Sequence, residues 1–310
     1  MNGLLYAVIM GLVFGTVPRA MPIFLASMGE TVDQASGVFN LGVEGIMLMG
    51  AITGFVVDFY TRNVLLSFLA AIAVGVGMSF IHAYVSISMA GDQTISGTAL
   101  WFIGWGLSGV IYARLFGLAT TPPSISLIPH VYVPNLTRIP IVGKLIFGED
   151  PLFYVGLLVL VVFQYLLFHT QFGLNLRAVG EDPRVAEIMG IDSYRYRYIA
   201  VLTGGALAGL GGAYLTLALV GSFYFNMTAG MGFIAVALVY FGKWNPWRVS
   251  VGSFVFGVIY ALYVTLESVF PSVPYQFFAI WPYLATMIAI FIVGARAHMP
   301  SSLAMPYIKE

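Results

Sequence analysis

The stretch LFYVGLLVLVVFQYLLF at residues 152–168 decides the fold class. It carries no charge, and it lacks the apolar–polar alternation over about ten residues that is typical of strands in a membrane barrel. A segment inside hydrocarbon must satisfy its own backbone hydrogen bonds, and a helix does so. About 20 apolar residues are enough for one helical crossing. We therefore predict a membrane-spanning helix here.

The rest of the 310-residue chain has the same character, because 60% of it is hydrophobic, 8% is charged and its mean hydropathy is +0.93. Soluble domains contain about 25% charged residues. This composition excludes a soluble enzyme, a nucleic-acid-binding protein and a single-span receptor with a large ectodomain. We predict one all-α domain over residues 1–310, a polytopic membrane bundle of about eight to ten crossings.

The candidate spans fall at about 4–26, 41–58, 64–84, 96–118, 152–170, 198–220, 229–242, 249–270 and 279–295. The first contains Pro18, Arg19 and Pro22, which predict a break. The seventh is short and contains glycine, so it is either half a helix or re-entrant, as in segments that line transport pathways, or a kinked structural helix.

Loop cations predict the orientation, because cytoplasmic loops are enriched in Lys and Arg. Placing 171–197 in the cytoplasm puts the C-terminal side inside and the N-terminal side outside. The cations expected inside are Arg19, Arg177, Arg184, Arg195, Arg197, Lys243, Arg248, Arg296 and Lys309, and those expected outside are Arg62, Arg114, Arg138 and Lys144. The stretch 119–150 is then external, and its prolines predict an irregular cap that is either a docking surface or a passive loop.

Motifs for enzymatic chemistry are absent from the sequence. It has no phosphate-binding loop, no H-E-x-x-H and no G-x-S-x-G. It has no cysteine, which excludes zinc–thiolate and iron–sulfur sites, and its four histidines are scattered. We predict neither a metal site nor a catalytic site.

Residues 182–190 predict a short cytoplasmic helix. Asp182 caps free N–H groups, Pro183 suits a first turn, and Gly190 ends the helix where φ is positive. Val185, Ala186, Ile188 and Met189 give it an apolar face. Such a face fits either a groove on a partner protein or the lipid headgroups.

Three stretches in order carry a family resemblance: GVFNLGVEGIMLMGA at 37–51, LRAVGEDPRVAEIMGID at 176–192 and NMTAGMGFIAVALVYFGKWNP at 226–246. They resemble permeases of ABC importers, in the subfamily serving branched-chain amino acids, simple sugars and nucleosides, and favour the nucleoside or sugar branch. Ala186-x-x-x-Gly190 matches the end of the importer motif E-A-A-x-x-x-G. The leading Glu of that motif is Arg184 here, so this match is partial.

The resemblance implies a cell-membrane subunit that forms the pathway for a nucleoside or simple sugar and is itself no enzyme. Cytoplasmic ABC ATPases, carrying ATP and Mg, would dock on a coupling segment at about 171–197. An extracytoplasmic solute-binding protein and a second permease, identical or different, would complete the importer. Lipid is the remaining partner, and no nucleic acid is expected. The residues expected to couple to the ATPase are Glu181, Asp182, Pro183, Arg184, Ala186, Met189 and Gly190.

Polar residues inside spans are costly to bury and mark partners or water-filled paths. The candidates for a substrate pathway are Asn40, Glu44, Gln93, Ser96, Phe223, Asn226 and Thr228. The alternative for each is a helix cap or an interhelical contact. The small-residue motif Gly205-x-x-x-Gly209 predicts that its helix packs closely against a neighbouring helix. The two helices either slide against each other there or form a static contact.

Other functions remain open at this point. One is a permease for branched-chain amino acids. Another is an ion-coupled secondary transporter with Glu44 as the coupling acid. A membrane-integral enzyme is disfavoured because the sequence shows no cluster of acids or metal ligands.

Overall fold

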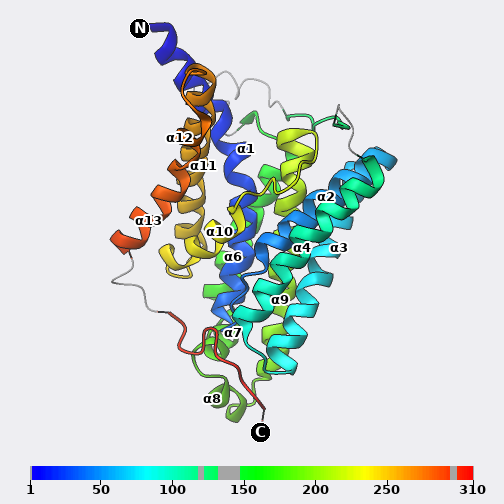
Figure 1. The fold of residues 1–310 in the computed structure, drawn as a ribbon. Helices are drawn as coiled ribbons and strands as arrows, with labels where there is room; N and C mark the ends of the chain where they lie inside the picture. Colours follow the sequence, from blue (N-terminus) through cyan, green and yellow to red (C-terminus); the bar gives the residue numbers. More distant parts are fainter. Residues whose placement is uncertain (1, 118–121, 132–146, 294–298, 310) are drawn as a thin grey trace.

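The computed structural model describes residues 2–117, 122–131, 147–293 and 299–309, which form an elongated helical bundle (Figure 1). The two ends of the chain lie at opposite ends of the bundle, and α8 lies at the same end as the C-terminus. The elements are α1 (Asn2–Ala35), α2 (Val43–Thr61), α3 (Val64–Ala83), η1 (Tyr84–Ser88), α4 (Gln93–Phe116), α6 (Pro151–His169), α7 (Gln171–Glu181), α8 (Pro183–Ile188), α9 (Ser193–Tyr214), η2 (Leu215–Val220), α10 (Met231–Phe241), α11 (Pro246–Val269), α12 (Tyr275–Ala279) and α13 (Trp281–Val293).

Seven helices in the described part of the chain are long and apolar enough to cross a membrane. They are Val8–Ala35, Val43–Thr61, Val64–Ser88, Gln93–Phe116, Pro151–His169, Ser193–Val220 and Pro246–Val269. The shorter apolar helices α10 and α13 occupy the seventh and ninth predicted spans. This confirms the all-α polytopic bundle.

The first predicted span is wrong in both its break and its end. Helix α1 runs through Pro18 and Pro22 as one 34-residue helix and ends at Ala35. Arg19 therefore lies within a span, where its guanidinium donates to Gly15 O, and not in a cytoplasmic loop. Neighbouring helices can support a proline-containing helix inside a membrane, and α1 packs against α9 and α11.

The sequence determines the helix starts through Asp and Asn caps. Asp92, Asp150, Asp182 and Asp192 each accept backbone N–H bonds at the starts of α4, α6, α8 and α9. Asn245 does the same for α11. Such side chains satisfy N–H groups that the first helical turn leaves free. Proline follows three of these caps, where its missing N–H costs nothing.

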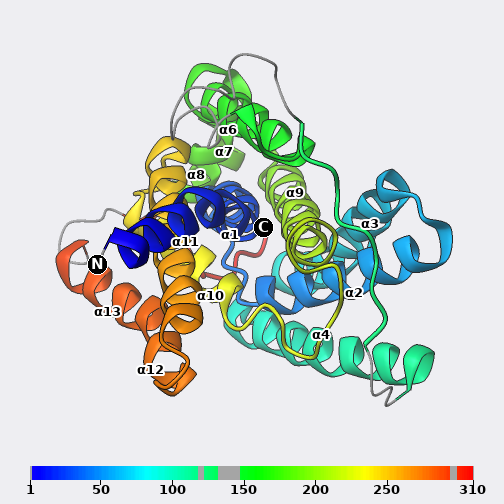
Figure 2. The same ribbon diagram turned by 90° about the horizontal axis from the view of Figure 1, so that it is seen from above.

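Helices α2 and α9 form the centre of the bundle beside α1 (Figure 2). In the most apolar 18-residue stretch of the spans Val43–Thr61 and Ser193–Val220, 72% and 78% of the residues are buried. Glycines bring their backbones against their neighbours. A Cβ added at Gly50 or Gly75 would lie under 3.0 Å from the backbone of α9 at Gly209 or Gly205. The close helix packing predicted for Gly205 and Gly209 is therefore present in the structure.

Between η2 and α10 the chain leaves regular helix. Residues 221–230 form turns, with positive φ at Gly221, Asn226, Ala229 and Gly230, before α10 begins at Met231. Helix α10 has 11 residues, so it spans about 16 Å at 1.5 Å per residue, roughly half of a hydrocarbon core. Of the alternatives predicted for 229–242, this length agrees with the half-helix.

The described part of the 119–150 stretch packs on the outer end of this break. Ile125 N donates to Gly221 O over 2.8 Å, and Ile128 N donates to Leu217 O over 3.0 Å. Ser222 Oγ donates to Pro123 O over 2.9 Å. Residues 122–131 thus cover the end of η2, while Pro134, Arg138, Pro140, Lys144 and Arg296 lie outside the described residues.

Candidate functional sites: the coupling segment and the broken helix

The short helix α8 has the predicted ends. Asp182 Oδ1 accepts from Arg184 N and Val185 N at 2.9 and 3.2 Å, which caps the first turn. Gly190 follows the last turn with φ +81°, a conformation that glycine adopts without steric cost. Helix α8 is therefore a short helix with a capped start and a glycine-terminated end, and it lies between α7 and α9.

The exposed face of α8 differs from the predicted one. Ile188 is 84% and Met189 75% exposed, and Val185 is also exposed. In contrast, Pro183 and Ala186 are buried against the protein, where Pro183 O accepts from Ser193 Oγ over 3.1 Å. Ala186 therefore supports α8 from within, and the apolar surface open to a partner consists of Val185, Ile188 and Met189. The remaining predicted coupling residues Glu181, Asp182, Arg184 and Gly190 are all exposed.

Residues 299–309 fasten the coupling segment to the rest of the bundle. Ser301 Oγ donates to Glu181 Oε1 over 2.6 Å, and Ser302 N donates to Gly180 O over 3.1 Å. Buried Arg197 donates from Nε to Ser36 O over 3.2 Å and from a terminal nitrogen to Ser302 Oγ over 3.1 Å. The exposed Lys309 forms an ion pair, 3.0 Å long, with the partly buried Glu187 of α8. Residues 299–309 are called the cytoplasmic strap below, because the loop cations predict that this end of the bundle faces the cytoplasm.

Glu44 holds the start of the half-helix α10. Its Oε1 accepts from Thr228 Oγ1 over 2.5 Å and from Gly230 N over 2.7 Å, and its Oε2 accepts from Gly232 N over 2.6 Å. A carboxylate suits the N-terminus of a helix, where free N–H groups and the helix dipole attract negative charge. Glu44 and Thr228, predicted separately, thus meet in one contact between α2 and α10.

The other predicted pathway residues do not join this contact. Gln93 Oε1 accepts from Phe39 N over 2.7 Å and its Nε2 donates to Met305 O over 3.4 Å, linking α4 to the strap. Ser96 Oγ bonds His82 Nδ1 at 3.1 Å. Asn40 Oδ1 accepts from Gly42 N over 2.9 Å before α2. The arrangement of these three matches the alternative of caps and interhelical contacts.

Exposed aromatic side chains surround the break, and sequence reasoning singled out only Phe223. Phe223 itself is buried against Tyr112, with ring centroids 5.5 Å apart, while Asn226 is exposed. Phe225 lies 4.9 Å from Trp105 of α4, and the Tyr283 hydroxyl of α13 donates to Ala229 O over 2.8 Å. The three successive aromatic residues FYF at 223–225, next to the residues that break the helix, were the sequence signal that could have predicted this group.

A buried acidic pair also escaped the sequence analysis, because α1 was expected to end at residue 26. Glu30 and Asp33 are fully buried one turn apart. Glu30 Oε2 accepts from Gln34 Nε2 over 3.3 Å, whereas Glu30 Oε1 and both carboxylate oxygens of Asp33 have no partner among the described residues. The described residues contain no group of His, Asp and Glu arranged to hold a metal ion.

A second acidic pair lies at the outer end. Asp150 accepts a short hydrogen bond from the Tyr214 hydroxyl of α9, and Glu149 O accepts from Val131 N over 2.9 Å. Burial, together with the neighbouring charge of Asp150, raises the pKa of the Glu149 carboxyl to about 8. This pair joins residues 122–131, α6 and α9.

A polytopic bundle with a broken helix near its middle and a protruding apolar turn at one end defines the class of membrane transport subunits. Known proteins give the particular family. A family model described as "Branched-chain amino acid transport system / permease component" matches residues 12–293. The chain belongs to this family, and it is a permease subunit of an ABC importer, a multi-pass cell-membrane protein rather than an enzyme, which works with ATPase and substrate-binding partners.

Two relatives and one solved structure illustrate the similarity. A Haloferax volcanii protein provisionally named a glucose ABC transporter permease is 36% identical, covering 97% of this chain and 98% of its own. A guanosine ABC transporter permease of Bacillus subtilis is 34% identical, covering 95% of each chain. A transporter described provisionally as of metal-chelate type, in an inward-facing conformation, shares the fold with TM-score 0.52 at 13% identity, covering 94% of this chain and 98% of its own.

Proposed function

We propose that this permease forms half of the pathway for a nucleoside or a simple sugar. The carrying observation is the break at 221–230, which places Tyr224, Phe225 and Asn226 on the surface between the two helices η2 and α10. Aromatic faces stack on nucleobases and cover the apolar faces of sugar rings, and an amide bonds hydroxyls and base edges. The names of relatives that match almost the whole chain, glucose and guanosine, support this solute class over branched-chain amino acids.

Ion-coupled transport through Glu44 is disfavoured by its contacts. Its carboxylate already accepts hydrogen bonds from Thr228, Gly230 and Gly232, and it is almost fully buried. A coupling acid must exchange its partner during each cycle, whereas this acid is held at the start of α10. The driving force we propose is ATP hydrolysis, with ATP and Mg bound by the partner ATPases.

The ATPase docks, in this proposal, on the exposed face of α8. Val185, Ile188 and Met189 form an apolar surface on a short helix that the strap holds in place. An exposed apolar helix face of this kind fits a groove on a partner. The second permease, identical or different, would then pair with this chain so that their broken helices face a common path.

Uptake by proteoliposomes tests the solute and the driving force together. The permeases, the ATPases and the binding protein are reconstituted, and ATP-dependent uptake of labelled guanosine and glucose is measured, with leucine as the control solute. We expect uptake of guanosine or glucose that stops without ATP. Leucine uptake, or uptake by the permease alone under a proton gradient, would contradict the proposal.

Docking is tested by pull-down of the ATPase. Ile188→Glu and Ile188→Lys each place a charge on the exposed face, so both should lower ATPase capture by about tenfold while size-exclusion profiles stay unchanged. Arg195→Glu, an exposed charge reversal nearby on α9, is the matched control and should bind normally. Normal capture by both Ile188 variants would remove α8 from the interface.

A further inference from the structure

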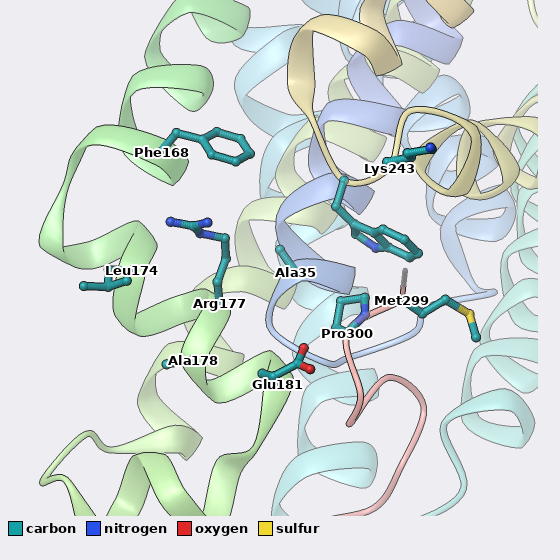
Figure 3. Close-up of a pocket in the computed structure, with 10 residues that line it drawn as sticks. Ala35, Phe168, Leu174, Arg177, Ala178, Glu181, Lys243, Met299 and Pro300 are labelled. Carbon is teal, nitrogen blue, oxygen red and sulfur yellow. The ribbon is translucent and has the colours of Figure 1, made fainter. Parts of the chain in front are cut away.

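A pocket of about 440 Å³ lies on the cytoplasmic half of the bundle, apart from α8 and from the break (Figure 3). Its walls come from the ends of α1, α6 and α7, from the turn between α10 and α11, and from the start of the strap. Arg177 of α7 lies at one side beneath Phe168, and Lys243 lies at the opposite side. Cations on two separate elements thus flank one cavity.

Trp244 lines this pocket, and its indole carries a buried donor without a partner among the described residues. The side chain is 8% exposed, and its indole Nε1 has no hydrogen-bond partner among the described residues. An indole N–H only donates, so it needs an acceptor, and buried polar groups in folded proteins are usually paired. Lys243 and Trp244 both have φ +53°, so the turn holds two successive non-glycine residues in the left-handed region.

The charges at the pocket favour an anion. The guanidinium of Arg177 lies against the face of the Phe168 ring, 4.9 Å from its centroid, and the Arg177 Nε donates to Gly173 O over 3.3 Å. Within the described residues, neither Arg177 nor Lys243 lies within 4.0 Å of a carboxylate oxygen. Glu181, the acid that lines the pocket, accepts from Ser301 N and Oγ at 3.3 and 2.6 Å, so its oxygens are engaged by the strap.

We propose that this pocket binds the phosphate of an anionic membrane phospholipid. A phosphodiester supplies the acceptor that Trp244 lacks and the negative charge that Arg177 and Lys243 lack. The position fits, because Lys, Arg and Trp at the cytoplasmic ends of spans meet the headgroups of the inner leaflet. Val161 of α6 and Val251 of α11 are more than half exposed, which leaves apolar surface for acyl chains. This inference is independent of the transported solute.

The test compares lipids retained by the purified full-length permease. The protein is incorporated into nanodiscs of phosphatidylcholine with about one fifth phosphatidylglycerol, extracted in mild detergent, and its bound lipid is measured by native mass spectrometry. We expect enrichment of phosphatidylglycerol over its share in the nanodisc. Retention in proportion to the lipid mixture would overturn the proposal, whatever the variants do.

Variants locate the site. The double variant Arg177→Gln with Lys243→Gln should lower phosphatidylglycerol retention by about tenfold, and Trp244→Phe, which keeps the ring and removes the N–H, by about threefold. Arg248→Gln is the matched control, because Arg248 is an exposed cation just beyond the same turn that does not line the pocket. Equal loss in Arg248→Gln, or no loss in the other two, would place the lipid elsewhere.

A competition arm separates a lipid from a soluble phosphate. Inorganic phosphate and glycerol 3-phosphate are added at millimolar concentration to lipid-depleted permease, and thermal unfolding is followed by tryptophan fluorescence. We expect stabilisation by phosphatidylglycerol and none by either soluble phosphate. Equal stabilisation by inorganic phosphate would identify a soluble-anion site and overturn the lipid assignment.

Discussion

Replacement of Glu44 by alanine is expected to destabilise the permease before it affects solute recognition. The change removes the acceptor for Thr228 Oγ1, Gly230 N and Gly232 N, which lie 2.5, 2.7 and 2.6 Å from the carboxylate oxygens. Each buried donor left unpaired costs about 1–3 kcal/mol. Because the three donors share one acceptor and can partly relax, we expect a total loss of about 3–6 kcal/mol.

The assay is thermal unfolding in detergent, followed by tryptophan fluorescence and paired with ATP-dependent uptake per folded molecule. An unfolding entropy of about 2.1 cal/mol/K per residue gives about 1.5 °C per kcal/mol for a chain of 310 residues, so the melting temperature of Glu44→Ala should fall by at least about 4 °C. Glu44→Gln keeps one acceptor oxygen, so its melting temperature should fall about half as far. Glu267→Ala, a partly exposed acid on α11, should change little. A wild-type melting temperature with lost uptake would refute this reasoning and restore Glu44 to the pathway.

Three further outcomes are expected. Gly104→Ala should lower stability by about 1–3 kcal/mol, because its Cβ would lie 2.5 Å from Gly45 Cα, whereas Gly106→Ala, with nothing within 4 Å, should match or exceed wild type in the same melting assay. Arg197→Ala should free the strap and speed its cleavage in limited proteolysis, while cleavage of the exposed Arg195→Ala should stay at the wild-type rate. The pKa of the Glu149 carboxyl rises from 4.5 to about 8 on folding, so the folded chain keeps a proton that the unfolded chain releases. The free energy of unfolding should therefore fall as pH rises from about 5 to 8.5. Glu149→Gln should flatten this pH dependence in the melting assay.

Local features of the sequence predicted the helices well, because spans and caps depend on nearby residues. Asp182, Pro183 and Gly190 determine α8 within its own few residues, and the prediction is confirmed at both ends. The end of α1 was not predictable in this way. Glu30 and Asp33 are charged types that normally mark a loop, and only the helices packed around them make this stretch a buried helix.

The sites were predicted less completely, since they depend on contacts between distant segments. Thr228 could be chosen as polar and intramembrane, but its bond to Glu44 joins residues that α2 and α10 bring together. Ala186 was expected at the partner surface, yet its orientation depends on packing of α8 against the protein. The cytoplasmic strap gave no sequence signal, because its hydrogen bonds and its ion pair each join it to a residue far away in the sequence, such as Glu181, Glu187 or Arg197.

The close glycine contacts in the centre of the bundle also determine where spectroscopic probes can be attached. The chain has no native cysteine, so any introduced thiol would carry a label alone. At Gly75 and Gly104 a side chain would meet the backbone of a neighbouring helix, whereas Gly77 and Gly106, on the same helices, face open space. Paired labels at Gly77 and Gly106 would therefore report distances during turnover without forcing apart the helices whose movement they are meant to follow.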